Sequence, residues 1–168
     1  MPSREPSQNF NFLMKLYIDM DGCLTDFEAA IKAIGAEEGL KENASEEDKR
    51  KMYRKIDEAG VSFWADMPWK EDGKKLWKSI RVFYPTILTS PGQFPFAIRG
   101  KEQWVSKNLP GVSIFFSNNK FQYAERDTIL IDDMFKNIGP WREMGGIGIL
   151  HKNAEQTEQQ LLSLLSPV

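Results

Sequence analysis

Two carboxylates follow a short apolar segment near the start of the chain. Asp19 and Asp21 come directly after the run Leu16–Ile18, and Gly22 follows them. Residues i and i+2 of an extended segment point to the same side, so both acids should project into one cavity. Two unit charges about 4 Å apart repel by roughly 4 kcal/mol at an effective dielectric of about 20. A fold that keeps this pair together therefore needs a cation or a proton beside it. The alternative is a strand that ends in a solvated Asp-Gly turn.

Polar side chains also follow three later apolar runs. Thr89 and Ser90 follow the second run, Lys120 lies just beyond the third, and Asp132 and Asp133 follow the fourth. Each has an ordinary interpretation as a turn, a surface lysine or a helix N-cap pair. Ligands of open α/β sheets, however, bind beyond the carboxyl ends of the strands. Polar groups at four successive strand ends therefore predict one shared site.

The chemistry of these side chains indicates a magnesium-dependent phosphoryl site. Four carboxylates and one lysine leave the site strongly negative, and a bound phosphate would add to that charge. Oxygen donors without histidine ligands favour a hard divalent cation, and Mg²⁺ is the natural choice. An aspartate can attack phosphorus and form an aspartyl-phosphate, while a second carboxylate protonates the leaving oxygen and later deprotonates water. Hydroxyl, amide and ammonium groups can hold the charge on the phosphoryl oxygens.

The pattern of short apolar runs predicts an α/β fold. Five runs are expected to be strands: residues 15–18, 86–88, 112–116, 128–131 and 147–150. None alternates cleanly with polar residues, which is typical of strands buried on both faces of a parallel sheet. Helical patterns lie between or after them, at residues 96–108, 134–143 and 153–165. The alternation of strand and helix predicts a Rossmann-like open parallel sheet of about five strands flanked by helices.

A long interval separates the first two predicted strands, and it is too long for an ordinary crossover connection. A helix is predicted from Ser45 to Ala59 and another over residues 73–83, with an aromatic, non-helical stretch at 61–69 between them. We therefore expect a small helical cap at residues 27–83, inserted after the first strand. Residues 12–26 and 84–168 would form the core domain. Residues 1–11 are expected to be a disordered N-terminus.

The overall composition excludes several classes of protein. A net charge of −2 gives no basic field for a nucleic-acid polymer, although a small phosphorylated ligand needs only local positive charge. The single cysteine, Cys23, makes no internal disulfide and is typical of a reducing compartment. No apolar run reaches the roughly 18 residues that a membrane span needs, and the N-terminus does not resemble a signal peptide. We expect a cytoplasmic protein, either a monomer or a homodimer.

The order of the motifs resembles that of the haloacid dehalogenase (HAD) superfamily of phosphohydrolases. That pattern has Asp-x-Asp after the first strand, Thr or Ser after the second, a later Lys, and an acidic pair after a further strand. The resemblance implies that Asp19 is the nucleophile and Asp21 the general acid and base. It implies that Thr89 and Lys120, with the neighbouring Ser90, bind the phosphoryl group.

The same resemblance implies a set of Mg²⁺ ligands. Asp19, the backbone carbonyl of Asp21, and Asp133 would bind the ion directly, with Asp132 assisting. Asp133 ranks above Asp132 because the metal-binding acid of the family usually lies one residue beyond the strand end.

The likeness extends to the 5′(3′)-deoxyribonucleotidases. It is carried by the segments 19–28, 63–68, 88–91, 104–105 and 130–133, together with Trp141. Aromatic side chains hold the nucleobase in that group, which implies that Phe27, Phe63 and Trp64 bind a base here. Ser117–Lys120 stands where the group has Thr-Arg-Asp-Lys, so an arginine contact is missing. The predicted function is hydrolysis of a small phosphomonoester, a nucleoside or deoxynucleoside monophosphate, through an aspartyl-phosphate.

Three alternatives stay open at this point. The substrate could be a phosphorylated metabolite that is not a nucleotide. A catalytically silent nucleotide-binding module is a second alternative, although such a module does not need the full polar set. A phospho-receiver signalling domain also has acids, a threonine and a lysine at strand ends. Its motif order differs, and it has no place for the long insertion.

Overall fold

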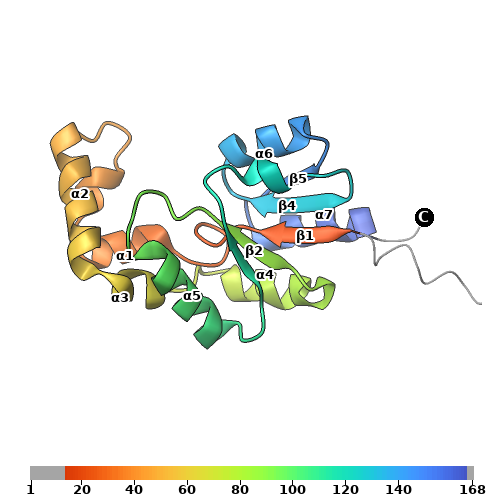
Figure 1. The fold of residues 1–168 in the computed structure, drawn as a ribbon, viewed down its shortest axis with the longest axis horizontal. Coiled ribbons are helices and arrows are strands. Elements are labelled where there is room, and N and C mark those ends of the chain that lie inside the picture. The colour runs from red at the N-terminus through yellow and green to blue at the C-terminus, as the bar shows by residue number, and fades with distance from the viewer. Residues whose placement is uncertain (1–13, 166–168) are drawn as a thin grey trace, which may run out of the picture.

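The computed structural model of the protein describes residues 14–165. Five parallel strands form one sheet in the order β3-β2-β1-β4-β5. The strands are β1 (Lys15–Ile18), β2 (Thr86–Thr89), β3 (Ile114–Phe116), β4 (Thr128–Asp132) and β5 (Ile147–Leu150). Helices flank this sheet (Figure 1). The predicted class, a Rossmann-like α/β fold with a five-stranded parallel sheet, is confirmed.

The centre of the sheet brings the acidic segments together. Strands β1 and β4 are adjacent and almost entirely buried, as their apolar sequences predict. Ile18 pairs with Ile131, and the backbone N–H of Asp19 donates to the carbonyl of Ile131 at 2.8 Å. Asp19 and Asp132 therefore leave neighbouring strands at the same edge.

Four helices pack beside the sheet. They are α4 (Gly73–Ile80), α5 (Ala97–Asn108), α6 (Phe135–Glu143) and α7 (Ala154–Leu165). Helix α6 contacts β4 and β5, while α7 contacts β5 and α4. Gly73 lets α4 begin close to the loop after β1, because a Cβ there would lie 2.5 Å from the carbonyl oxygen of Leu24. The predicted helix over 73–83 ends at Ile80 and continues as a 3-10 turn, η2 (Arg81–Phe83).

The insertion after β1 forms a group of helices that extends away from the sheet (Figure 1). It contains α1 (Phe27–Ala33), η1 (Glu37–Leu40), α2 (Glu46–Ala59) and α3 (Val61–Ala65). Asp26 caps α1 by accepting from the N–H of Ala29, and Ser45 caps α2 by accepting from the N–H of Asp48. Helix α4 also lies within the range 27–83 that was expected to form the cap, but it packs on α7 beside the sheet.

The segment 61–69 was expected to be non-helical, and this prediction was wrong for its first half. Gly60 ends α2 with a φ of 67°, and α3 begins directly after it. Phe63 and Trp64 are buried on α3, which packs against α5. Gly100 allows this contact, since a Cβ there would lie 2.3 Å from the Cβ of Trp64. Burial of the two aromatic rings thus stabilises a helix too short to form alone.

The core is continuous from the sheet into the insertion. Trp104 is 1% exposed and its Nε1 donates to the carbonyl of Met67 at 2.8 Å, so it is part of this core. None of the helices between residues 14 and 165 is both long and apolar enough to cross a bilayer. The expected disordered segment, residues 1–11, lies outside the described residues.

Candidate functional site

Asp19 lies directly beyond β1 and is 7% exposed. The ammonium of Lys120 donates to Asp19 Oδ1 and to Asp132 Oδ2, both at 2.7 Å. Lys120 itself is buried, as is Asp132. One lysine from the segment after β3 therefore bridges carboxylates from β1 and β4.

Asp132 is fully engaged in hydrogen bonds. Its Oδ1 accepts from the backbone N–H of Met134 at 2.9 Å, and its Oδ2 accepts from Asn137 Nδ2 at 3.0 Å as well as from Lys120. These contacts hold the Lys120 ammonium against Asp19. Asp132 thus contacts the lysine in this structure, and its predicted assistance to a metal stays a prediction.

Asp133 presents an oxygen without a protein partner. Its Oδ1 is buried and makes no hydrogen bond. Ligand atoms of Asp19, Cys23 and Asp133 all lie within 4.8 Å of one another. Gly22 makes room for the Asp133 carboxylate, because a Cβ at this position would lie 2.1 Å from Asp133 Oδ2. Two converging carboxylates with an orphaned oxygen fit a hard divalent cation such as Mg²⁺.

The sulfur of Cys23 is the exception in this group. Burial, together with the carboxylate of Asp19, raises the pKa of the Cys23 thiol well above its usual value. Only the thiolate ligates metals well, and sulfur suits softer ions than Mg²⁺. The oxygen donors of Asp19 and Asp133 are therefore the ligands that the site offers to Mg²⁺.

Burial also changes the acidity of the charged groups. Desolvation raises the pKa of Asp19 to about 8, although Lys120 opposes this shift. Burial raises the pKa of Asp133 as well, with a further contribution from the charge of Asp132. Burial works against the Lys120 ammonium, but the carboxylates of Asp19 and Asp132 outweigh it and raise its pKa. The protein therefore concentrates more negative charge here than one lysine neutralises, which favours a bound cation.

Asp21 is held from two sides. Thr25 Oγ1 donates to Asp21 Oδ1 at 2.7 Å, and Lys101 Nζ donates to Asp21 Oδ2 at 2.9 Å. Thr25 in turn forms an isolated antiparallel bridge with Trp69. The Asp21 side chain remains 25% exposed. It therefore faces the same cleft as Asp19 in a fixed orientation.

Lys101, on α5, is a site residue that the sequence reasoning missed. Its side chain is 2% exposed, and its three N–H donors reach Asp21 Oδ2, Thr89 Oγ1 (2.8 Å) and the carbonyl of Ser90 (2.9 Å). The ammonium also lies over the ring of Trp64, 5.2 Å from its centroid. The site thus contains two buried ammonium groups.

A signal for Lys101 was present in the sequence. It lies four residues after Ala97 and three before Trp104, on the face of α5 that carries the apolar side chains. A lysine on the buried face of a helix is rarely tolerated without an acidic or polar partner. The pattern therefore indicated a buried charge, although it did not identify the partner.

Thr89 and Ser90 lie at the end of β2 beside Asp21. Thr89 is 1% exposed and accepts from Lys101. Ser90 Oγ donates to Asn118 Oδ1 at 2.5 Å, and Gly92 N–H donates to the same oxygen at 3.1 Å. Ser90 lines the cleft and joins the loop after β2 to the loop after β3, whereas Thr89 is buried behind it and is not among the lining residues. Their binding of a phosphoryl group stays a prediction.

A cleft of about 790 Å³ contains the site. Asp19, Asp21, Lys120 and Asp133 line it, and so does Lys101.

Aromatic side chains form part of the cleft wall. Phe27 and Trp64 line it, as does Phe94, which the sequence reasoning did not select. Phe63 is not among the lining residues; its ring packs edge-on against Phe27 at 5.9 Å and against Trp64 at 4.9 Å. Phe63 therefore supports the two rings that face the cleft. A role of Phe27, Phe63 or Trp64 in base binding stays a prediction.

Comparison with known proteins identifies the fold. No family model matches the chain, and no curated protein matches its sequence. Among solved structures, a hydrolase from Streptococcus pneumoniae superposes with a TM-score of 0.57 and 15% identity, covering 89% of this chain and 98% of its own. A haloacid dehalogenase-like family hydrolase from Xanthomonas campestris superposes with a TM-score of 0.55 and 12% identity, covering 90% of this chain and 92% of its own.

A third structure is similar over most of both chains. It is a HAD-hydrolase from Bacillus subtilis bound to magnesium, with a TM-score of 0.53 and 13% identity, and it covers 92% of this chain and 99% of its own. At these identities the comparisons establish the fold alone. The chain therefore has the fold of HAD-superfamily hydrolases.

Proposed function

We propose that this protein is a Mg²⁺-dependent phosphatase of the HAD type that hydrolyses a small phosphomonoester through an aspartyl-phosphate on Asp19. The observation that carries this proposal is the position of Asp19. It lies at the carboxyl end of a central strand, 2.7 Å from the buried Lys120 ammonium and close to Asp133, whose Oδ1 has no partner. A structural ion pair alone gives no reason for that additional, unpartnered carboxylate.

Asp19 supplies the nucleophile in this proposal. One of its oxygens attacks phosphorus, and the bond from phosphorus to the ester oxygen breaks. Mg²⁺, held by Asp19, Asp133 and the backbone carbonyl of Asp21, would neutralise phosphoryl charge and reduce repulsion of the attacking carboxylate. The Lys120 ammonium adds positive charge beside Asp19 and so favours its ionised, nucleophilic form.

Asp21 acts as general acid and then as general base. Its carboxyl group delivers a proton to the leaving oxygen and later takes one from the water that attacks the phosphoenzyme. Thr25 and Lys101 hold the carboxylate so that it faces the cleft. Thr89 accepts from Lys101, which leaves its own hydroxyl proton to donate to a phosphoryl oxygen.

The substrate proposed is a nucleoside monophosphate. The cleft volume of about 790 Å³ lies within the range of small-molecule sites, about 300–1,000 Å³. Phe27, Trp64 and Phe94 offer an aromatic wall, and Lys70 and Lys136 also line the cleft. A planar base against the rings and a phosphate among the cations match this arrangement.

Phosphate release from a substrate panel tests the proposal. The panel contains dUMP, dTMP, their ribose counterparts and sugar phosphates, each assayed with Mg²⁺ and with EDTA. We expect turnover only with Mg²⁺, highest for a nucleotide, and a loss of about 10³-fold or more in Asp19→Asn. Asp127→Asn, which changes an exposed aspartate, serves as the matched control. Full activity of Asp19→Asn would overturn the mechanism, and preference for a sugar phosphate would overturn the substrate class.

A further inference from the structure

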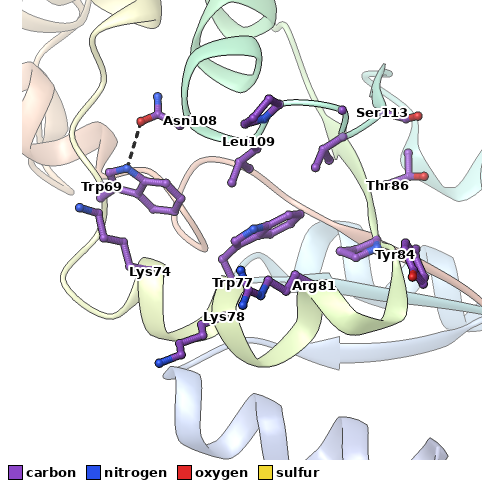
Figure 2. Close-up of a pocket in the computed structure, with 14 residues that line it drawn as sticks. Trp69, Lys74, Trp77, Lys78, Arg81, Tyr84, Thr86, Asn108, Leu109 and Ser113 are labelled. Atoms are coloured by element: carbon purple, nitrogen blue, oxygen red, sulfur yellow. Dashed lines mark hydrogen bonds between the residues drawn. The ribbon is translucent and has the colours of Figure 1, made fainter.

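A second cavity of about 700 Å³ lies away from the cleft. One wall is α4 with η2, and the other is the segment that connects α5 to β3 (Figure 2). Thr86 and Ser113 line it at the amino ends of β2 and β3, whereas the cleft lies beyond the carboxyl ends. The two cavities share no lining residue among those described, so the second one is a separate feature.

Three cationic side chains line this cavity without acidic partners. Lys74, Lys78 and Arg81 follow one another at helical spacing on α4 and η2. None of the described residues that line the cavity is acidic. Within residues 14–165, none of the three cations has a carboxylate oxygen within 4.0 Å. In a chain of net charge −2, the cavity therefore gathers uncompensated positive charge.

Two aromatic rings accompany the cations. Trp77 projects from α4 into the centre of the view, with Arg81 beside it (Figure 2). Trp77 stacks on no other aromatic ring within the described part of the chain. Trp69, by contrast, is fixed: it packs on Trp104 with 4.8 Å between centroids, and its Nε1 donates to Asn108 Oδ1 at 3.3 Å. Trp77 is partly buried against the hydrophobic core and also lines the cavity, where it has no aromatic partner among the described residues.

Tyr84 is a further aromatic residue at this cavity. Its side chain is 88% exposed, and its backbone has a φ of 52°, in the left-handed region that bulky residues rarely adopt. A solvated helix face would explain the lysines and the arginine alone. Packing on the core accounts for the buried part of Trp77, but neither feature explains an exposed tyrosine beside the same cations.

We propose that this cavity binds a small ligand that joins a planar ring to phosphate groups, of the nucleoside diphosphate class. The ring would stack on Trp77, with Tyr84 at the rim. The phosphates would pair with Arg81 and Lys74, since guanidinium and ammonium groups are the usual partners of phosphate oxygens. A diphosphate matches three cations better than a monophosphate does. This inference is independent of the phosphatase activity proposed for the cleft.

An NMR titration with ADP tests the proposal on the full chain. The Asp19→Asn variant in EDTA is used, so that neither hydrolysis nor a metal ion contributes. We expect the indole N–H of Trp77 and the amides of α4 to shift and saturate with ADP. Adenosine and pyrophosphate, each titrated alone, should bind at least about tenfold more weakly, because each makes only half of the contacts.

Variants that remove positive charge test whether ADP binds in this cavity. Lys74→Gln/Arg81→Gln should weaken ADP binding by at least about tenfold, since two charge-assisted contacts are lost. Lys75→Gln/Lys32→Gln makes the same change in charge at exposed positions outside the cavity and should bind ADP as before. The proposal is overturned if ADP shifts only resonances of the cleft, if pyrophosphate binds as tightly as ADP, or if the Lys74→Gln/Arg81→Gln variant binds ADP with unchanged affinity.

Discussion

Lys101 connects Asp21 to the end of β2. Its ammonium contacts Asp21, Thr89 and the carbonyl of Ser90, and it uses all three of its donors in doing so. A buried lysine with three acceptors fixes their relative positions more tightly than a solvent-exposed ion pair would. We infer that it is a positioning residue for Asp21, which is the group proposed to move protons.

Replacing Lys101 should impair proton transfer more than binding. Lys101→Met removes the donor while keeping the length of the side chain, so Asp21 loses one of its two side-chain hydrogen bonds. We expect kcat to fall about 100-fold with a smaller change in KM, and the pH profile of kcat to shift. Lys107→Met, at an exposed position on the same helix, is the control. Equal changes in both variants would contradict this role.

The raised pKa of Asp19 predicts how stability depends on pH when Mg²⁺ is removed. The folded state holds a proton on Asp19 up to about pH 8, whereas the unfolded chain releases it near 3.8. The proton on Asp19 therefore adds to the free energy of unfolding. This contribution is fully present below pH 3.8 and is lost as the pH rises through about 8. Urea unfolding in EDTA at several pH values between 4 and 9 measures it.

Asp19→Asn removes the titrating group and should reduce that pH dependence. Asp127→Asn should retain the dependence of the wild type. If Asp19→Asn loses as much stability with rising pH as the wild type does, the titration belongs to another group.

At the scale of elements, the loops after β1 and β4 fit together through a glycine. Gly22 has a φ of 89°, and the space where its Cβ would lie is taken by the carboxylate of Asp133. The absence of a side chain therefore serves two purposes: it permits the left-handed turn, and it admits the acid proposed to bind Mg²⁺.

Gly22→Ala should lower both stability and the affinity for Mg²⁺. The new methyl group displaces Asp133 in addition to straining the backbone. Gly145→Ala is a close control, because Gly145 has a φ of 91° and nothing within 4 Å of its Cβ position. Isothermal titration with MgCl₂ and thermal unfolding compare the two. We expect both variants to be destabilised but only Gly22→Ala to bind Mg²⁺ at least about tenfold more weakly. Equal Mg²⁺ affinity in both variants would contradict the proposed ligand.

For the whole molecule, the sequence predicted those features that depend on local pattern. The strands at 15–18 and 147–150 were predicted with the bounds observed, and the one at 128–131 to within one residue, because buried parallel strands are short apolar runs. Asp19 and Asp132 could be placed together because parallel strands end at one edge. Helix α3 could not be predicted, since its helicity depends on packing against α5, far away in the sequence.

The sequence also could not identify the partners of the buried lysines. Lys120 contacts Asp19 across 101 positions of the chain, and Lys101 contacts Asp21 across 80. The second cavity likewise requires α4 and the segment before β3 to lie side by side. A local pattern can indicate that a charge is buried, but only the fold determines which group neutralises it.

Trapping of the phosphoenzyme tests the central claim most directly. The protein is mixed with Mg²⁺ and p-nitrophenyl phosphate, quenched in acid during turnover, reduced with borohydride and digested for mass spectrometry. Borohydride converts an acyl phosphate on aspartate to homoserine, so the reduced residue marks the nucleophile. We predict that the label appears at Asp19 alone, and that Asp21→Asn still forms it. A label at another residue, or sustained phosphate release without any trapped residue, would contradict the account.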